Sequence, residues 1–281
     1  MADGKKTVLI TGCSPGGIGH ALALEFHGKG CYVIATARDI SKLESLSSRG
    51  IKTLELDVTS PENIVKVKEE VTQITGGKLD YLVNNAGRNY TVPALDIDLD
   101  EVREMFETNV FAVMRMCQVF TPLLIEAKGC IVQIGSLAGI MPYVFGSTYN
   151  ASKAALHAYS NTLRVELAPF GVRVVTIVTG GVKSNIARVD RILKEDSLYQ
   201  PIKEEYARRV KHSQEVGMDT TQYAKSVTRQ VLQSRPAKWI WEGGSSRLVW
   251  FVTTFLPQGI MDFVMTRMFR LWKLKTHNKH K

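Results

Sequence analysis

Residues 7–20 read TVLITGCSPGGIGH, a short apolar run followed by a turn that contains four glycines. The run "TVLI" favours a buried strand, and the spacing of apolar residues over 18–28 favours a helix directly after the turn. Glycines let the backbone of such a turn come close to an anion, and the start of the following helix offers free N–H groups and a positive dipole end. The stretch therefore predicts a phosphate-binding loop after the first strand.

The alternation of strand and helix continues along the chain. Pro61 suits the first turn of a helix, and strands that are apolar throughout and separated by helices form a parallel sheet covered on both faces. We expect an α/β fold: a doubly wound (Rossmann) sheet of about seven parallel strands with helices on both faces and ligands at the carboxyl ends of the strands. The remaining strands are expected at 31–37, 51–58, 79–87, 129–136, 171–181 and 238–244.

The chain of 281 residues is 44% apolar, which suits a globular protein with a sizeable core. Its net charge is +9, and residues 238–281 contribute +6 of it, from eight Lys and Arg against Glu242 and Asp262. A basic end favours contact with an acidic surface through that end, so we expect no nucleic-acid partner.

Cysteine usage favours a reducing compartment. We see no C-x-x-C pair and no signal peptide in "MADGKKTVLI", and each cysteine lies in an apolar run, which is typical of a buried free thiol. The cysteines are Cys13, Cys31, Cys117 and Cys130.

The loop also fits a second motif. Residues 12–16 match G-x-S-x-G, the turn that presents the serine nucleophile of many hydrolases. Such a serine needs a downstream histidine, and between residues 28 and 276 the chain has only His157 and His212. His157 lies in a helical pattern, as a structural or surface residue. A serine lipase or esterase that uses Ser14 is therefore kept as an alternative of another class, and a cofactor-bound interaction protein without turnover as a third.

A group of polar residues further along the chain favours redox chemistry. Tyr149 and Lys153 are four residues apart in a helical pattern and so share one face. Ser136 ends the strand predicted at 129–136, and Asn109 lies in a helical pattern before that strand. The run "NNAG" at 84–87 ends another strand.

With these residues, the sequence resembles the short-chain dehydrogenase/reductase family over about residues 5–245. The family's loop T-G-x-x-x-G-x-G corresponds to residues 11–19, with one extra residue between the first and second glycines, and its N-N-A-G corresponds to 84–87. The family's catalytic tetrad matches Asn109, Ser136, Tyr149 and Lys153.

The resemblance implies hydride transfer from a nicotinamide to a ketone. Tyr149 is then the general acid. A phenol has a pKa of about 10, which a nearby ammonium and the positive ring of an oxidised cofactor lower. Lys153 supplies that ammonium and, by resemblance, binds the nicotinamide ribose. Ser136 donates to the carbonyl oxygen, where negative charge develops. Asn109, by resemblance, holds a water that links Lys153 to solvent.

The end of the second strand bears on the choice of cofactor. An NAD enzyme places an acidic residue there, whereas Arg38 suits the 2′-phosphate of NADP, and Asp39 can cap the helix that follows. We expect NADPH and no metal. Thr179 and Ser184 replace a proline and a threonine of the family's motif. The cofactor contacts expected are Gly12, Ser14, Gly17, Ile18, Gly19, Arg38, Asp57, Asn85, Tyr149, Lys153, Val182 and Ser184.

We predict two parts: a Rossmann-fold reductase domain over 1–244, with a substrate lid at 183–225, and an apolar, basic extension over 245–281. Residues 183–212 hold eight basic and five acidic residues, so the lid is either solvated or meets an anionic head group. The run "LVWFVTTFL" at 248–256 is too short to span a bilayer. It favours an interfacial helix, with core packing or a dimer contact as the alternative.

Within the family, "SLAG" at 136–139, "TGGV" at 179–182 and the lipophilic C-terminus resemble the fungal NADPH-dependent reductases of 1-acyl-dihydroxyacetone phosphate. The expected reaction forms 1-acylglycerol 3-phosphate, in phosphatidic acid biosynthesis, with a hydroxysteroid or another lipophilic carbonyl as the alternative substrate. We expect a homodimer or homotetramer at the cytosolic face of the endoplasmic reticulum or a lipid droplet, or otherwise in the cytoplasm, with peripheral membrane contact through the C-terminus.

Overall fold

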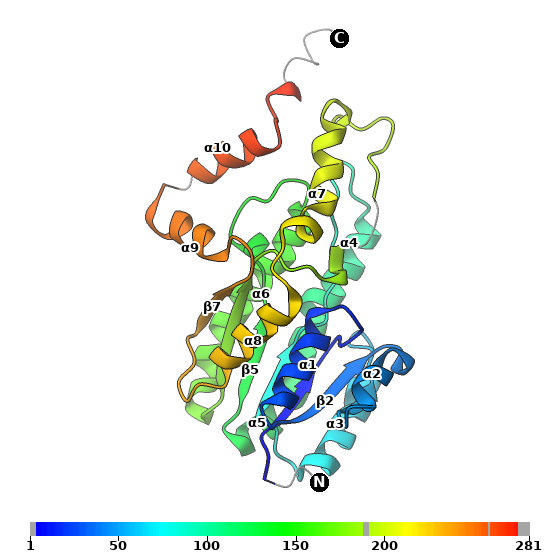
Figure 1. The fold of residues 1–281 in the computed structure, drawn as a ribbon, viewed down its shortest axis with the longest axis vertical. Helices are drawn as coiled ribbons and strands as arrows, with labels where there is room; N and C mark the ends of the chain where they lie inside the picture. Colours follow the sequence, from blue (N-terminus) through cyan, green and yellow to red (C-terminus); the bar gives the residue numbers. More distant parts are fainter. Residues whose placement is uncertain (1–3, 188–190, 258, 275–281) are drawn as a thin grey trace.

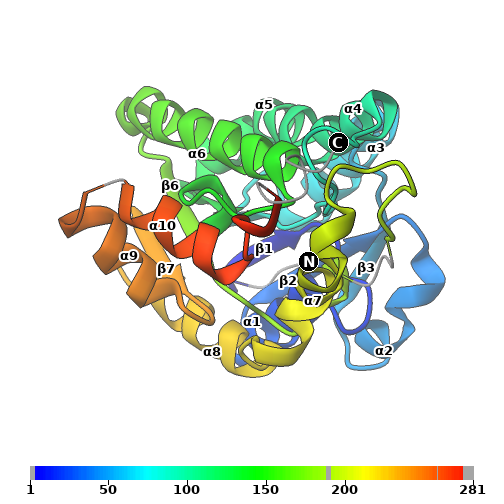
Figure 2. The same ribbon diagram turned by 90° about the horizontal axis from the view of Figure 1, so that it is seen from above.

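A parallel sheet runs through the computed structural model, which describes residues 4–187, 191–257 and 259–274 (Figures 1 and 2). Within these residues, seven strands follow the order β3-β2-β1-β4-β5-β6-β7, and each neighbouring pair is parallel. The order reverses between β1 and β4, which is where doubly wound folds bind ligands. The predicted fold class is confirmed. The strands are β1 (Thr7–Ile10), β2 (Tyr32–Ala37), β3 (Lys52–Glu55), β4 (Tyr81–Asn84), β5 (Cys130–Ile134), β6 (Arg173–Thr179) and β7 (Trp239–Glu242).

Helices cover both faces of the sheet. One face packs against α1 (Ile18–Gly28) and α8 (Thr220–Val231), and the other against α3 (Pro61–Thr75), α5 (Ala112–Ala127) and α6 (Ser147–Leu167). Strand β1 shows the reason: Val8 and Ile10 share a buried cluster with Phe26 of α1, whereas Leu9 shares one with Phe120 of α5. Alternate side chains of a strand point to opposite faces, so an apolar run needs a cover on each side.

One long apolar helix belongs to this core. α4 (Leu99–Phe106), a π-helical segment (Glu107–Phe111) and α5 form a continuous helix, Leu99–Ala127, which by length and composition alone could cross a membrane. Phe120 and Leu124 of this helix are fully buried against the sheet. The helix is therefore a core element of the domain.

The chain after β6 rises above the carboxyl end of the sheet. It forms short 3₁₀ turns at Asn185–Ala187 and Gln200–Ile202 and then α7 (Lys203–Val216). α8, whose first residues fall within the predicted lid, packs against α1 instead. The short helix α2 (Glu44–Ser47) follows β2 at the far edge of the sheet.

The C-terminal extension forms two helices over the same end. α9 (Ser246–Phe255) and α10 (Gly259–Met268) follow β7 and lie beside α7 above the sheet (Figures 1 and 2). Met261 and Met265 of α10 share a buried cluster with Phe145, Ile202 and Tyr206. The inner side of the extension is thus packed on the domain. The last residues of the predicted basic tail, 275–281, lie outside the described residues.

Hydrogen bonds join the segments that follow β6 and β7. Thr179, at the end of β6, stands where the resemblance places a proline. The Thr179 and Tyr223 hydroxyls are 2.7 Å apart and hydrogen-bonded. The Gly180 N–H donates to the Glu242 carbonyl at 2.8 Å, and Gly181 and Gly244 exchange two backbone hydrogen bonds. A Cβ at Gly180 would lie 2.2 Å from the Gly244 carbonyl oxygen, so this crossing needs glycine.

We expect Gly180→Ala to lower the free energy of unfolding by about 2 kcal/mol or more, since the added methyl group must push β6 and β7 apart. Chemical denaturation measures this change. Gly28→Ala is the control, because a Cβ at Gly28 meets nothing within 4 Å. Equal stability of the two variants would contradict this account of the crossing.

Candidate active site

A cavity of about 800 Å³ lies at the carboxyl end of the sheet. Its wall is made by the glycine loop, the ends of β2, β4, β5 and β6, and by parts of α6, α7, α9 and α10. Of the residues predicted to act at the site, Gly19 and Asn109 lie behind this wall. The wall itself includes Gly12, Ser14, Gly17, Ile18, Arg38, Asp57, Asn85, Ser136, Tyr149, Lys153, Val182 and Ser184.

The glycine loop is shaped to hold an anion. Gly12 has a φ of +74°, and a Cβ there would lie 2.9 Å from the Ala86 Cα. A Cβ at Gly19 would lie 2.5 Å from the Gly12 carbonyl oxygen. Gly17 begins α1 without a side-chain cap, so the first N–H groups of the helix are available to a ligand. The loop and the helix end therefore fit the pyrophosphate of a dinucleotide.

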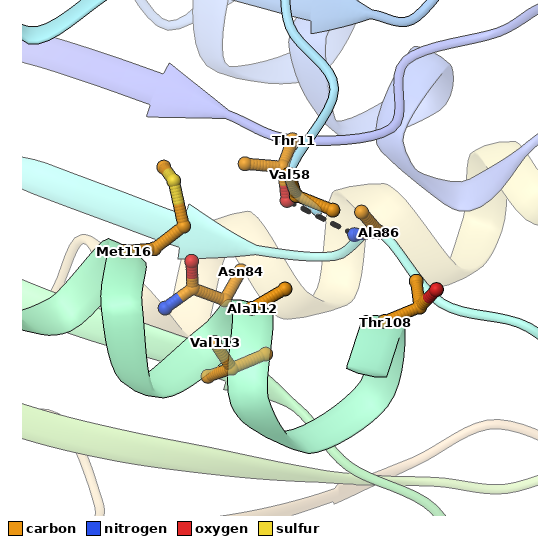
Figure 3. Close-up of a pocket in the computed structure, with 8 residues that line it drawn as sticks. All are labelled: Thr11, Val58, Asn84, Ala86, Thr108, Ala112, Val113 and Met116. Carbon is orange, nitrogen blue, oxygen red and sulfur yellow. Dashed lines mark hydrogen bonds between the residues drawn. The ribbon is translucent and has the colours of Figure 1, made fainter. Parts of the chain in front are cut away.

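Two side chains hold this loop from behind. The Asn85 side-chain amide donates to the carbonyls of Thr11 and Gly12 at 2.8 and 3.0 Å, so Asn85 acts on the loop backbone. The Thr11 hydroxyl accepts the N–H groups of Asn85 and Ala86, each at 3.0 Å. Figure 3 shows the hydrogen bond between Thr11 and Ala86, with Val58 and Met116 among the side chains around it. The loop thus rests on a fixed floor between β1 and β4.

The extra residue of the loop lies on its outer side. Gly16 adopts a φ of +72°, and the neighbouring Pro15 carbonyl accepts a hydrogen bond from the Asn185 side chain. Asn185 also lines the cavity, and the sequence pattern did not point to it. The insertion therefore joins the glycine loop to the segment after β6, while Gly17 still begins α1.

The side chains of Arg38 and Asp39, at the end of β2, have different surroundings. The Asp39 carboxylate accepts from the Ser41 N–H at 3.0 Å and from its hydroxyl at 2.6 Å, which caps the 3₁₀ turn Ile40–Leu43. These hydrogen bonds lower the pKa of Asp39. Arg38 lines the cavity instead. Asp57 also lines the cavity, and its carboxylate accepts the N–H and hydroxyl of Thr59.

Tyr149, Lys153 and Ser136 converge on one point of the cavity wall. The Lys153 amino group donates to the Ile134 carbonyl at 3.0 Å and lies 5.9 Å from the centre of the Tyr149 ring. Burial lowers the pKa of Lys153 to about 8. Burial raises the pKa of Tyr149, against a hydrogen bond with Ser136 and the charge of Arg209. The phenol therefore keeps its proton near neutral pH, which suits a general acid.

Asn109 holds the loop after β4. It lies in the π-helical segment, is buried, and its side chain accepts the Arg88 N–H at 2.8 Å. Its amide donates to the Arg88 carbonyl at 2.9 Å and to the Ser152 hydroxyl at 3.1 Å. Since these bonds join the β4 loop to α6, Asn109 is a positioning residue in this structure.

His157 is a second positioning residue, and its role was missed in the sequence. The sequence predicted a structural or surface residue at this position. In the structure His157 is buried, and its Nε2 accepts the Ser136 N–H at 3.2 Å. Its ring packs edge-on against Trp239 at 5.2 Å, and burial lowers its pKa to about 4. His157 is thereby committed to Ser136 and not to Ser14. The His212 side chain lies outside what the structure describes.

The cysteines take no part in the site. Cys13, Cys31, Cys117 and Cys130 are buried free thiols, as predicted. Burial raises the pKa of Cys13 to about 12, although it lies in the glycine loop. A thiol of that pKa is not a nucleophile at neutral pH.

The comparisons with known proteins agree with this geometry. The sequence model described as short chain dehydrogenase matches residues 6–192. The short-chain dehydrogenase srdE of Neurospora crassa is 45% identical over 272 residues, 96% of this chain and 94% of the relative. The NADPH-dependent 1-acyldihydroxyacetone phosphate reductase of Schizosaccharomyces pombe is 48% identical over 205 residues, 71% of this chain and 69% of the relative.

A solved structure of a short-chain dehydrogenase from Streptomyces avermitilis matches with a TM-score of 0.78 at 28% identity, covering 97% of this chain and 98% of that one. The chain belongs to the short-chain dehydrogenase/reductase family and is an oxidoreductase. The resemblance identified from the glycine loop and the tetrad is thus confirmed.

We expect His157 to make the folded protein less stable at acid pH. A base whose folded pKa of about 4 lies below its ordinary 6.5 stays neutral in the folded state, while the unfolded chain takes up the proton. The free energy of unfolding therefore falls by about 3 kcal/mol in total as the pH drops from about 6.5 to 4. Urea titrations at a series of pH values measure this loss.

His157→Gln is the matched variant, because its side-chain oxygen can accept the Ser136 N–H without titrating. Its stability should fall less than that of wild type over the same pH interval. Parallel curves for the two proteins would mean that His157 does not carry the acid sensitivity.

Proposed function

We propose that this enzyme uses NADPH to reduce a lipophilic ketone, most specifically 1-acyl-dihydroxyacetone phosphate to 1-acylglycerol 3-phosphate. The observation that carries the proposal is the form of the cavity: the tyrosine, serine and lysine lie in one wall, and apolar side chains form another. The apolar wall comes from the C-terminal helices, with Leu248, Val249, Val252, Ile260, Met261, Val264, Met265 and Met268. An acyl chain is the kind of group that such a wall accommodates.

Arg38 and Asp39 support the choice of NADPH. With Asp39 used as a cap, the group at the end of β2 that faces the cavity is a guanidinium, which matches a 2′-phosphate better than a ribose hydroxyl. The Schizosaccharomyces pombe relative is NADPH-dependent by name.

The residues of the site divide the chemistry among them. The bound nicotinamide supplies the hydride for the carbonyl carbon. Tyr149 gives its proton to the carbonyl oxygen, and Ser136 donates a hydrogen bond to that oxygen as charge develops on it. Lys153, whose pKa of about 8 keeps it mostly charged at pH 7, stabilises the phenolate that remains. The Ile134 carbonyl holds this ammonium in place at 3.0 Å.

A hydroxysteroid or another lipophilic carbonyl is the second candidate substrate. It is supported by the apolar wall, which has no feature specific to a straight chain, and by full-length relatives that are named only as short-chain dehydrogenases. We keep the homodimer or homotetramer as a prediction.

We also propose that the outer side of the C-terminal helices meets a membrane, at the cytosolic face of the endoplasmic reticulum or on a lipid droplet. Each helix has 10 residues, too few to span a bilayer, yet their outer side exposes large apolar groups. Phe251 is 51% exposed, Phe255 61% and Phe263 62%. Because the inner side lines the cavity, a lipid substrate could enter from the same surface.

Tyr149→Phe should lower kcat for reduction of 1-acyl-dihydroxyacetone phosphate by about 100-fold or more, because the proton donor is lost. NADPH oxidation followed by absorbance measures the rate, and fluorescence of bound NADPH shows that binding survives. Tyr159→Phe, on the same helix away from the cavity, is the control. Full turnover by Tyr149→Phe would contradict the mechanism, and ester hydrolysis lost only in Ser14→Ala would favour the lipase alternative.

Arg38→Ala should raise KM for NADPH by about 10- to 100-fold and reduce the preference for NADPH over NADH, because a charge-assisted pair with the 2′-phosphate is removed. Steady-state kinetics with both cofactors measures this preference. Arg49→Ala, an exposed arginine after α2, should leave it as in wild type. A wild-type enzyme that prefers NADH would reject the assignment.

A variant with Phe251, Phe255 and Phe263 changed to serine should lose flotation with vesicles of phosphatidylcholine and phosphatidylserine, since burial of each phenyl ring contributes about 2 kcal/mol. The control changes two exposed phenylalanines elsewhere on the surface to serine, Phe111 and Phe170, which are 51% and 55% exposed. Flotation that is equal in the two variants, or absent in wild type, would contradict membrane contact.

A further inference from the structure

Arg209 differs from the other basic residues of the predicted lid in its burial and its contacts. Arg191 is paired with Glu101 at 2.9 Å and stacked on Tyr90, and Arg188 lies outside the described residues. The side chain of Arg209 on α7 is only 7% exposed and lines the cavity. The other Lys and Arg residues of the described lid are exposed: Lys183, Lys194, Lys203, Arg208, Lys211 and Lys225.

Within the described part of the chain, no carboxylate pairs with Arg209. Glu205, one helical turn earlier on α7, pairs instead with Lys273 at 3.3 Å and Arg270 at 3.5 Å in the C-terminal extension. Among the residues that the structure describes, no ion pair or hydrogen bond reaches the Arg209 guanidinium, and its Nε is buried without an acceptor. A buried, unpaired charge is costly, so such a group is expected to have a partner when the site is in use.

The guanidinium is nevertheless held in a defined position. Its central carbon lies 3.7 Å from the centre of the Tyr143 ring, so one face is covered by an aromatic ring and its N–H groups remain at the edge. A Cβ at Gly146 would lie 3.6 Å from the Arg209 Nη2. Gly146 immediately precedes α6, three residues before the catalytic tyrosine. The cation is thus fixed beside the reacting end of the cavity.

We propose that Arg209 binds an anionic group, a phosphate in the first instance, carried by the substrate on the carbon next to the ketone. This inference rests on the proposed function and names the residue that selects its substrate. With the ketone oxygen at Ser136 and Tyr149, a phosphate one carbon away lies toward α7, and its oxygens match the fork of N–H donors on a guanidinium. The acyl chain then extends along the apolar wall of α9 and α10.

The same arrangement bears on proton transfer. The charge of Arg209 lowers the pKa of Tyr149, in the direction that favours loss of the proton. A phosphate on Arg209 neutralises that charge while the substrate is bound, so the tyrosine keeps its proton until the hydride arrives. Burial lowers the pKa of Arg209, and the nearby Tyr143, Tyr149 and Tyr206 act in the opposite direction.

The first test compares two substrates, 1-acyl-dihydroxyacetone phosphate and the same ketone without its phosphate. In wild type, we expect removal of the phosphate to lower kcat/KM by about 100-fold, mostly through KM. In Arg209→Met this ratio should fall to below about 5-fold, and Arg209→Lys should give an intermediate value because it keeps the charge but not the fork. Lys211→Met, an exposed neighbour with the same change of charge, should keep the wild-type ratio.

The second test does not depend on turnover. Calorimetric titration of the NADP-loaded enzyme with decyl phosphate, decanol and inorganic phosphate separates the contributions of head group and chain. We expect decyl phosphate to bind at least 30-fold more tightly than decanol in wild type, with that difference lost in Arg209→Met and kept in Lys211→Met. Binding of inorganic phosphate that depends on Arg209 would point to a free phosphate as a ligand of the same residue.

The outcomes separate the two proposals. If neither ketone is reduced but decyl phosphate still binds through Arg209, the anion site stands and the proposed substrate is wrong. Equal binding of decyl phosphate and decanol by wild type, or an unchanged phosphate preference in a folded Arg209→Met variant, would overturn the anion site. Circular dichroism and NADPH binding show whether that variant is folded.

Discussion

The hydrogen bond from the Lys153 amino group to the Ile134 carbonyl, 3.0 Å long and buried, is the interaction on which the active site depends. It ties α6 to the end of β5 at the carboxyl edge of the sheet. One turn further along α6, His157 accepts the Ser136 N–H and repeats the attachment. The two bonds fix Tyr149 and Ser136 relative to each other before any ligand arrives, which is what preorganised catalysis requires.

Burial of an ammonium costs free energy, and the hydrogen bond to the Ile134 carbonyl offsets part of that cost. Hydrogen bonds also hold the loops on both sides of the site. The glycine loop rests on Thr11 and Asn85, and the β6 and β7 ends are locked around Gly180. Parts of α7 and the C-terminal helices form the other wall of the cavity. The chemistry is thus placed at the edge of the sheet, and we propose that substrate selection lies in the segments after β6.

Much of this could be predicted from the sequence because the signals are local or fixed in chain order. Apolar runs mark the strands, and the spacing of Tyr149 and Lys153 sets one helical face. The direction of side chains could not be predicted. Whether Asp39 faces a cofactor or caps a turn depends on the position of the Ser41 backbone. Which basic residue of the lid lines the cavity depends on where α7 packs, and that residue is Arg209. His157 and Asn185 were missed because their partners lie 21 and 170 residues away.

The two predictions for the C-terminal extension concern different sides of it: packing on the domain is observed for the inner side, and membrane contact of the outer side stays a proposal. Its inner methionines pack on the domain and line the cavity, whereas its outer aromatic residues face outward. Helical periodicity alone indicates that the segment has apolar residues all round, and only the position of α10 over the cavity separates the two sides. The serine of the opening loop motif lies on the wall of this same cavity, in a phosphate-binding turn.

Transfer of deuterium tests the central claim most directly. The enzyme is supplied with NADPH that carries deuterium at the transferable C4 position and with 1-acyl-dihydroxyacetone phosphate, and the product is analysed by mass spectrometry. The account predicts 1-acylglycerol 3-phosphate with one deuterium on the new carbinol carbon. A product without deuterium, or fatty acid released from the ester with no oxidation of NADPH, would contradict it.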